Sequence, residues 1–355
     1  MQFSEAEQRA MRRALELAGT SGVPLGPNPR VGCVLLDPDG SEVAEGYHRG
    51  AGTAHAEAAA LAQLREAGAG DAARGTTAVV TLEPCNHTGR TGPCSQALIE
   101  AGVARVVFAQ PDPNPVARGG EDALRAAGVD VAFGLLERDA RALNRAWTFA
   151  MEHGRPFVTW KLAATLDGRS AAADGSSRWI TGEPARRDVH RLRAECDAIL
   201  VGTATVELDD PQLTVRDEVG MPAAHQPLRV VMGEREIATG RRVLDDAAET
   251  VQLRTHDPRA VLAELHELGK QHLFLEGGPT VAAAFLRAGL VDEVVAYVAP
   301  KLLGDGPNVV GDLAVGSIAD SLDLTLLDVT RLGDDVRLTY QRAPLVELVE
   351  TKETA

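Results

Sequence analysis

The feature that most constrains this chain is a group of four side chains supplied by two separate motifs. His55-Ala56-Glu57 contributes an imidazole and a carboxylate, while Pro84-Cys85 and the later Cys94 contribute two thiols. Two thiolates and one imidazole are three ligands for Zn²⁺, and a tetrahedral zinc ion then keeps its fourth position open for water. The fold must therefore bring residue 55 next to residues 85 and 94.

The sequence around the two cysteines predicts the elements that would hold them. The apolar run from Thr76 to Leu82 is typical of a buried strand, so Cys85 follows the end of a strand. Cys94 lies at the start of a helix that stops at Gly102. A thiol at a helix N-terminus has a lowered pKa and is ready to bind a metal as the thiolate. Both cysteines are therefore candidate metal ligands.

His55 and Glu57 lie at the start of an alanine-rich helix that is predicted to run to Gly68. Two positions along an ideal helix correspond to a rotation of about 200°, so the two side chains can converge only in the first turn. A carboxylate beside an open metal position can carry a proton from water to a departing amine, as in zinc deaminases. Eight residues, Asn86 to Pro93, separate the cysteines here, whereas the common deaminase motif has two.

Other interpretations of these residues stay open. A lone buried cysteine is usually a small hydrophobic residue, and a non-catalytic module stabilised by zinc would use the same ligands. Such a structural site has no need for an acid like Glu57. A deaminase acting on nucleic acid is disfavoured by the formal net charge of −15, because a nucleic-acid partner requires a basic face.

The length of 355 residues suits two domains, each large enough for its own core. Apolar runs stay shorter than the ~20 residues that span a bilayer, and the first residues lack the regions of a signal peptide. Four cysteines are typical of a reducing compartment rather than of a disulfide framework. We therefore expect a cytoplasmic protein without a membrane partner, in which Cys33 and Cys196 are buried thiols.

Helix and strand signals alternate along both halves, which predicts an α/β protein. The expected domains are residues 1–150 and 155–345, on either side of Gly154-Arg155-Pro156. Expected helices cover residues 6–18, 55–67, 95–101, 120–127, 183–193, 258–268 and 280–288. Expected strands cover residues 31–36, 79–82, 103–109, 129–133, 157–163, 198–201, 229–232, 272–275, 293–298 and 336–342. The last dozen residues are expected to form a tail.

Gly277-Gly278 joins an expected strand to an expected helix. Backbone N–H groups and the helix dipole at such a turn can bind a pyrophosphate. A tight connection between strand and helix explains the two glycines equally well. The chain has no G-x-G-x-x-G motif, so a Rossmann domain is not predicted.

With these motifs in view, the chain resembles the RibD family of bifunctional riboflavin-biosynthesis proteins, in which a pyrimidine deaminase is fused to a pyrimidine reductase. The long loop between the cysteines separates this family from cytidine and tRNA adenosine deaminases. Gly92 stands where the family usually has proline. The first-half motifs that carry the resemblance are Pro27-Asn28-Pro29-Arg30-Val31-Gly32, Gly46-Tyr47-His48, His55-Ala56-Glu57, the run from Glu83 to Cys94, and Asp112-Pro113-Asn114-Pro115.

The resemblance implies a cytidine-deaminase-like N-terminal domain that binds Zn²⁺. Glu57 would be its proton shuttle, and the zinc ligands would be His55, Cys85 and Cys94. The residues implied to hold the base and the phosphate are Asn28, His48, His87 and Arg90.

The second half resembles the family's reductase domain, which has a dihydrofolate-reductase-like fold and uses NADPH. The runs that carry this resemblance are Lys161 to Gly168, Ser177 to Gly182, His190 to Arg193, Asp197 to Gly202, Asp209-Asp210-Pro211, Leu213 to Arg216, and Leu275 to Thr280. The implied NADPH contacts are Ala163, Trp179, Thr205, Asp209, Gly278, Pro279, Thr280, Val281, Ala282, Ala283 and Ala284. The implied sugar-phosphate contacts are Ser177, Arg193, Leu213, Arg216 and Glu276, and Lys161 is implied to lie near the reacting C1′ of the ribose. The run Met232-Gly233-Glu234-Arg235 departs from the family pattern.

The implied substrate is 2,5-diamino-6-ribosylamino-4(3H)-pyrimidinone 5′-phosphate. Deamination and then reduction by NADPH would give 5-amino-6-ribitylaminouracil 5′-phosphate. We expect a homo-oligomeric enzyme acting on this small molecule, with no nucleic-acid partner. The alternative is a tRNA adenosine deaminase with an unrelated C-terminal domain.

Overall fold

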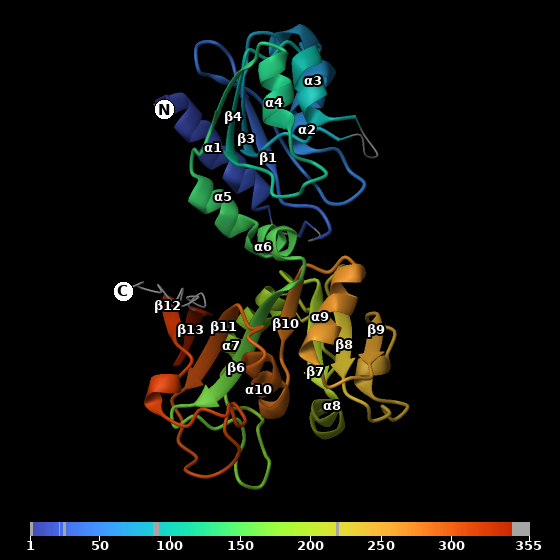
Figure 1. Ribbon diagram of the computed structural model, residues 1–355, viewed down its shortest axis with the longest axis vertical. Coiled ribbons are helices and arrows are strands. Elements are labelled where there is room, and N and C mark those ends of the chain that lie inside the picture. The colour runs from blue at the N-terminus through green and yellow to red at the C-terminus, as the bar shows by residue number, and fades with distance from the viewer. Residues whose placement is uncertain (1–2, 21, 24–25, 88–91, 218–219, 343–355) are drawn as a thin grey trace, which may run out of the picture. The chain divides into compact units, whose positions relative to one another are not determined.

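The computed structural model describes residues 3–20, 22–23, 26–87, 92–217 and 220–342 (Figure 1). The chain divides into two compact units, one formed by residues 1–156 with 269–271 and the other by residues 157–268 with 272 onward. Each unit has a sheet with helices on both faces, so the prediction of an α/β protein is confirmed. Within the described residues, no helix has the length and apolar character needed to cross a membrane.

The sheet of the first unit combines antiparallel and parallel strands. β1 is antiparallel to β2 and to β3, whereas β3, β4 and β5 are parallel to one another. The start of β1 therefore lies beside the end of β3. In sheet order the strands are β2 (Glu42–Tyr47), β1 (Gly32–Leu36), β3 (Thr77–Leu82), β4 (Arg105–Gln110) and β5 (Asp130–Phe133).

Period-two alternation along β1 explains why helices cover both faces of this sheet. Cys33 and Leu35 pack in the cluster formed with α2 (Ala56–Glu66), α3 (Cys94–Glu100) and α4 (Gly120–Ala126). Val34 and Leu36 point the other way, into the cluster formed with α1 (Glu5–Ala18) and α5 (Glu137–Leu143). A further helix, α6 (Arg145–His153), and a 3₁₀ turn, Gly70–Ala73, complete the regular elements of this unit.

In the second unit, most strands run parallel. β11, β6, β10, β7, β8 and β9 are parallel neighbours, and β13 pairs antiparallel with β11 and β12 at one edge. In sheet order the strands are β12 (Leu324–Leu332), β13 (Asp335–Arg342), β11 (Glu293–Ala299), β6 (Phe157–Thr165), β10 (His272–Leu275), β7 (Ala198–Gly202), β8 (Leu228–Met232) and β9 (Thr250–Leu253).

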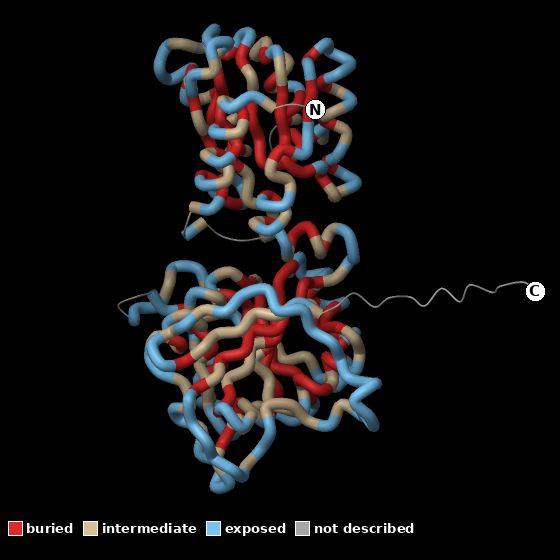
Figure 2. Tube along the Cα trace, turned by 90° about the vertical axis from the view of Figure 1, so that its left-hand side faces the viewer, coloured by how far each residue is buried: buried red, intermediate tan, exposed pale blue. Residues whose placement is uncertain are grey.

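Helices cover both faces of this second sheet as well. α9 (Pro258–Glu267) and α10 (Pro279–Arg287) pack on the face that includes Trp160 and Leu200. α7 (Glu183–Arg193) and α8 (Thr203–Asp209) pack on the face that includes Ile199 and Phe274. The most deeply buried residues of each unit follow its strands (Figure 2). Short 3₁₀ turns occur at Arg242–Leu244 and Ile318–Asp320.

Each helix and strand expected from the sequence is present, with ends shifted by up to about two residues, a usual uncertainty of boundaries. The expected tail lies outside the described residues. The structure adds β2, α5, α6, α8, β9 and β12, which the sequence analysis did not predict. β12 is largely exposed along both of its faces, so its sequence lacks the alternation that marks a half-buried strand.

Candidate functional site

The topology of the first unit gathers the candidate residues at one edge of its sheet. β3 ends at Leu82, and the chain continues directly into Glu83-Pro84-Cys85. Gly32 at the start of β1 pairs with Tyr47 at the end of β2, so the residues before β1 and after β2 reach the same edge. Asn28, His48 and Cys85 thereby come together although they are far apart in the sequence.

His55 is the N-cap of α2, with an extended backbone (φ −69°, ψ 161°), and Glu57 lies in the first turn. Because His55 precedes the helical residues, the angular conflict expected for two positions on one helix does not arise. Glu57 is only 3% exposed. This local geometry lets the imidazole and the carboxylate face the same region, as the sequence required.

The imidazole and two thiols form a cluster with the spacing of metal ligands. Nδ1 of His55 lies 3.6 Å from Sγ of Cys85 and 3.3 Å from Sγ of Cys94, and the candidate ligand atoms all lie within 4.8 Å of one another. Tetrahedral zinc with bonds of about 2.3 Å to sulfur and 2.0 Å to nitrogen places a ligand nitrogen roughly 3.5 Å from a ligand sulfur. The residues present therefore fit a zinc ion.

The environment of this cluster shifts the acidities of its members. Burial and the nearby Cys85 together raise the pKa of Glu57 to about 7, although a backbone hydrogen bond acts to lower this pKa. Hydrogen bonds from Cys94 and His55 lower the pKa of Cys85 to about 4. Cys85 thus tends toward the thiolate that a metal requires, while Glu57 can exchange a proton near neutral pH.

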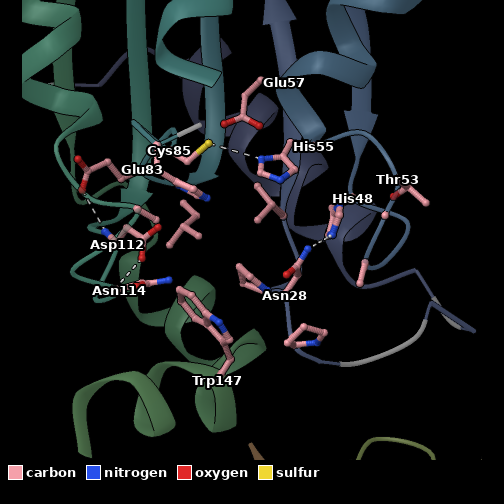
Figure 3. Close-up of a pocket in the computed structure, with 18 residues that line it drawn as sticks. Asn28, His48, Thr53, His55, Glu57, Glu83, Cys85, Asp112, Asn114 and Trp147 are labelled. Atoms are coloured by element: carbon pink, nitrogen blue, oxygen red, sulfur yellow. Dashed lines mark hydrogen bonds between the residues drawn. The ribbon is translucent and has the colours of Figure 1, made fainter. Parts of the chain in front are cut away.

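A cavity of about 390 Å³ opens beside the cluster, within the size range of small-molecule sites (Figure 3). His55, Glu57 and Cys85 lie on one side of it, and the sequence-predicted Asn28, His48 and His87 also line it. Arg90, the remaining residue expected at this site, lies outside the described residues.

His48 orients Asn28 within this cavity. Its Nδ1 lies 3.0 Å from the carbonyl oxygen of Ala54, which can only accept, so Nδ1 carries the proton. Nε2 then accepts a hydrogen bond from Nδ2 of Asn28 over 3.0 Å. Burial lowers the pKa of His48, which favours this neutral form. Within this pair, the side-chain carbonyl oxygen of Asn28 can accept a hydrogen bond from a ligand.

Glu83, which the sequence analysis left without a role, organises the opposite wall. Its Oε2 accepts from the backbone N–H of Asp112, and its Oε1 accepts from the N–H groups of Gly119 and Glu121, at 3.0–3.1 Å. Burial and nearby negative charge raise the pKa of Asp112 to about 6. The position of Glu83 directly before Pro84-Cys85 was the available sequence signal.

Trp147 of α6 is a second cavity residue that the sequence analysis missed. It lies more than fifty positions after Cys94 in the sequence, and an aromatic residue in a helix carries no local signal of a site. Nδ1 of His87 is buried and has no hydrogen-bond partner among the described residues, so it is one polar atom that a ligand could satisfy.

The second unit holds a buried charge cluster built from sequence-predicted residues. Leu275 pairs with Trp160, so Glu276 follows β10 at the level of Lys161 on β6. Arg193 donates to Glu276 through Nε at 2.6 Å and Nη2 at 3.0 Å, and Nζ of Lys161 lies 3.8 Å from the same carboxylate. Burial raises the pKa of Glu276, but Arg193 and Lys161 outweigh it and lower the pKa to about 2. Burial also lowers the pKa of Lys161.

The start of α10 fits a cofactor pyrophosphate. Gly278 is its N-cap without a side-chain cap, which leaves first-turn N–H groups available for a ligand. A Cβ at Gly278 would lie 3.6 Å from Oγ1 of Thr205, so the sequence-predicted Gly278 and Thr205 are neighbours. Ala282 and Ala283 are buried, and Ala282 packs in the core. A ligand can therefore contact α10 at its first turn, whereas the buried alanines after that turn are not accessible to it.

The other reductase residues expected from the sequence are more dispersed. Leu213 is buried with φ 54°, Arg216 is exposed and donates to Gln212, and Trp179 is 63% exposed with the Arg186 guanidinium 4.5 Å from its ring centre. Ala163 and Ser177 are half-buried, and the backbone carbonyl of exposed Asp209 accepts a hydrogen bond from Arg178. The structure joins Lys161, Arg193 and Glu276 directly, but the contacts described here do not bring Ser177 or Asp209 into that cluster.

Gly233, in the run that departs from the family pattern, occupies a position that favours glycine. Its φ of 133° lies outside the usual range of L side chains, and a Cβ there would lie 2.9 Å from Oγ1 of Thr203. Glycine at this position accommodates the approach of α8 to the end of β8.

Comparison with known families gives one match for each unit. Residues 4–110 match the cytidine and deoxycytidylate deaminase zinc-binding region, and residues 156–338 match the RibD C-terminal domain. The chain is thus a zinc-dependent deaminase joined to a reductase of the dihydrofolate-reductase-like type, which uses NADPH. The expectation of an unrelated C-terminal domain behind a tRNA deaminase finds no support.

More specifically, the chain belongs to the RibD family of bifunctional riboflavin biosynthesis proteins. It is 48% identical to RibD of Mycobacterium tuberculosis over 338 residues, covering 95% of this chain and 96% of that protein. It is 43% identical to RibD of Escherichia coli, covering 92% and 97%. The solved structure of Acinetobacter baumannii RibD has a TM-score of 0.89 at 38% identity, covering 96% of this chain and 99% of that chain.

A further solved structure comes from Thermotoga maritima and is described as a diaminohydroxyphosphoribosylaminopyrimidine deaminase and 5-amino-6-(5-phosphoribosylamino)uracil reductase. It has a TM-score of 0.87 at 32% identity and covers 95% of this chain and 99% of that chain. The predicted family and fold class are therefore confirmed.

Proposed function

We propose that the chain deaminates 2,5-diamino-6-ribosylamino-4(3H)-pyrimidinone 5′-phosphate and then reduces its ribosyl group to give 5-amino-6-ribitylaminouracil 5′-phosphate. The observation that carries the first step is the His55–Cys85–Cys94 cluster with the buried Glu57 beside the cavity. The observation that supports the second is the Lys161–Glu276–Arg193 cluster. The family relationship reported above supports both steps.

In the first unit, His55, Cys85 and Cys94 would hold zinc, and zinc supplies a Lewis acid that lowers the pKa of a bound water. Glu57 takes a proton from the attacking water on its carboxylate and delivers it to the departing amino nitrogen. One C–N bond breaks, one C–O bond forms, and ammonia leaves. The pKa of Glu57, raised to about 7 by burial, suits a group that must both accept and donate a proton.

Substrate recognition in this unit falls to residues around the cavity. Asn28 presents its carbonyl oxygen to a ring N–H or amino group because His48 occupies its amide nitrogen. His87 offers a ring nitrogen from the same cavity. Arg90 is proposed to bind the phosphate, since a guanidinium can bind phosphate oxygens bidentately.

In the second unit, the first turn of α10 would hold NADPH, which when bound would supply the hydride chemistry needed to reduce C1′ of the ring-opened ribose. Lys161 lies on β6 beside Glu276 and is proposed to hold or donate a proton near that carbon. Both carboxylate oxygens of Glu276 accept hydrogen bonds from Arg193, and Lys161 lies within ion-pair distance. We therefore propose that Glu276 holds Arg193 and Lys161 in place. Arg216 is exposed and suited to the substrate phosphate.

The remaining assignments follow the same scheme. The first turn of α10, Gly278 to Val281, and Thr205 are proposed to bind the cofactor pyrophosphate. We propose that the next residues of the helix hold this turn in place; they are Ala282, Ala283 and Ala284. The proposed NADPH contacts also include Ala163, Trp179 and Asp209, and the proposed sugar-phosphate contacts include Ser177 and Leu213.

We also propose that each activity resides in its own unit, with residues 1–150 carrying deamination and residues 155–345 carrying reduction. The metal cluster and the cavity lie in the first unit, and the charge cluster lies in the second. Each unit has its own hydrophobic core. Separate point variants should therefore remove one activity without the other.

A homo-oligomer is proposed as the working form. The edge strand β12 exposes Leu324, Leu326, Leu327 and Val329, which are 40–57% exposed. Apolar side chains on an open edge favour pairing with another strand, and a second copy is the commonest partner in soluble oligomers. Sedimentation equilibrium should give a mass above 37.5 kDa, and charged residues at Leu326 and Val329 should lower it.

We propose a cytoplasmic location and no nucleic-acid partner. The four cysteines are free thiols, as suits a reducing compartment. The net charge of −15 disfavours nucleic acid.

The decisive experiment supplies purified protein with the diamino substrate and NADPH, and measures ammonia release and NADPH oxidation together. We expect one zinc per chain and both activities. Cys85→Ala should lose zinc and ammonia release but keep reduction of the deaminated substrate. Absence of zinc in the active wild-type protein, or equal zinc in Cys85→Ala, would contradict the metal assignment.

A further inference from the structure

Trp147 closes the deaminase cavity from a helix that lies outside the matched zinc-binding region. It belongs to α6, whereas that match ends at residue 110. The indole is only 7% exposed and lines the cavity. Figure 3 shows it across the cavity from His55 and Glu57. The cavity therefore extends from the metal cluster to the indole.

Hydrogen bonds on both sides fix the backbone that carries Trp147. Asn144, three residues earlier, accepts from the N–H of Arg30 and donates to its carbonyl, both over 2.8 Å. The hydroxyl of Thr148, the next residue, accepts from Gln110 over 2.9 Å. Arg30 is two residues from Asn28, and Gln110 is two residues from Asp112. The indole is thus tied to both walls of the cavity.

The indole offers an apolar surface and one donor. Its N–H makes no hydrogen bond with the described residues, and it is not among their buried unpartnered atoms. A buried tryptophan usually pairs its N–H, so this open donor is available to a ligand. Asn28 and Asp112, which also line the cavity, offer polar groups instead.

We infer that Trp147 is a specificity-determining residue for the deamination step, and this inference rests on the proposed function. The carbon that loses its amino group must approach the His55–Cys85–Cys94 cluster and Glu57. The far edge of the pyrimidine, with its 5-amino and 6-ribosylamino substituents, then points toward Trp147. The indole face packs against that edge, and its N–H donates to an oxygen or nitrogen there.

The first test measures deamination kinetics. Trp147→Leu should raise the KM for the diamino substrate about tenfold with little change in kcat, because it removes a contact made in both ground and transition states. Trp147→Phe, which keeps an aromatic ring of smaller size but loses the N–H, should raise KM about threefold. Phe149→Leu is the matched control, since Phe149 lies on α6 but does not line the cavity. Zinc content and reduction of the deaminated substrate should stay at wild-type levels.

A second test reads binding without turnover. In a Glu57→Gln background, adding the diamino substrate should change tryptophan emission, and Trp147→Phe should abolish most of that change while Trp160 and Trp179 remain. This readout holds even if Trp147→Leu fails to fold. An unchanged KM in zinc-loaded Trp147→Leu, or an emission change that persists in Trp147→Phe, would overturn the role of Trp147. Wild-type protein that releases no ammonia would instead overturn the proposed function, and this inference with it.

Discussion

A glutamate shielded from solvent lies beside the candidate reacting groups of each unit, Glu57 in the first and Glu276 in the second, and the pKa values of the two carboxyl groups are shifted in opposite directions. Glu57 lies at the start of α2 beside thiols and an imidazole, and burial raises its pKa to about 7. Glu276 follows β10 and is also buried, but Arg193 and Lys161 lower its pKa to about 2. Desolvation acts on both groups, and only Glu276 has cationic side chains within ion-pair distance.

The comparison teaches that burial alone does not define a carboxyl group's role. Glu57 titrates near neutral pH and can carry a proton, as hydrolysis of an amine requires. Glu276 remains an anion across the physiological range and acts as a fixed counter-charge. Deamination moves protons between water and nitrogen, whereas reduction needs a substrate and a cofactor held in register. The two glutamates match these different demands.

The sharpest test of the comparison is Glu57→Gln. Because an amide cannot carry the proton, ammonia release should fall by a factor of about 10² to 10⁴. Zinc content should be unchanged, because His55, Cys85 and Cys94 remain. NADPH oxidation with the deaminated substrate should also be unchanged. If that reduction were lost too, a site shared by the two activities would be required.

Glu276→Gln should act through stability and geometry. It leaves the guanidinium of Arg193 and the ammonium of Lys161 partly buried without a counter-charge, and breaking such a pair costs about 3 kcal/mol. We expect a lower free energy of unfolding of the second unit, measured by urea denaturation, and loss of NADPH oxidation with ammonia release preserved. The control is Glu183→Gln, which removes an exposed ion pair with Arg187 and should cost less than about 1 kcal/mol. Equal losses of unfolding free energy in the two variants would show that Glu276 stabilises the second unit no more than an exposed ion pair does.

Substitutions at Gly278 separate cofactor binding from backbone strain. Its φ of −62° suits any residue, and a Cβ would meet Thr205 only at ordinary contact distance. Gly278→Ala should therefore stay close to wild type, whereas Gly278→Leu should raise the KM for NADPH about tenfold by filling the space of the pyrophosphate. Steady-state NADPH oxidation measures both. If Leu is tolerated with an unchanged KM, the turn is structural only.

The smallest expected effect is a pH dependence of stability. The folded-state pKa of Glu276, about 2, lies below the ordinary value of 4.5, so its ionised form stabilises the folded second unit at pH values above 4.5. This contribution should decline as the pH falls from 4.5 toward 2. The stability difference between wild type and Glu276→Gln, followed by urea denaturation, should narrow over that range. A difference independent of pH there would show that Glu276 is not the titrating group.

Local sequence was sufficient to predict candidate site residues where these residues lie at the ends of helices and strands that short motifs mark. His55, Glu57 and the cysteines lie at element ends marked by strand runs, proline and glycine, and the structure brings them together as expected. The cofactor turn at Gly278 was likewise readable as a strand that opens a helix. Lys161, Arg193 and Glu276 were expected at the reductase site from the family resemblance alone. The implied contact of Glu276 with the sugar phosphate stays a prediction, and its hydrogen bonds with Arg193 add an electrostatic role.

Other features could not be predicted from local sequence, because they depend on contacts between segments that lie far apart in the chain. Glu83 acquires its role only when the loop from Asp112 to Glu121 folds back onto it. Trp147 reaches the cavity only because Asn144 and Thr148 attach α6 to two distant segments. β12 was missed because its side chains are exposed on both faces and leave no periodic pattern.

The sequence by itself determined the α/β class, the family, the candidate metal-binding residues and the acid proposed to carry the proton, because these follow from short motifs and the period of apolar residues. Only the tertiary structure decided which buried glutamate titrates near neutral pH and which stays charged, and which aromatic residue closes the cavity. The physical reason is that a pKa and a cavity wall depend on distances between residues far apart in the chain, such as Glu276 and Arg193 at 2.6 Å. Those distances are set by strand register and helix packing, which no single segment encodes.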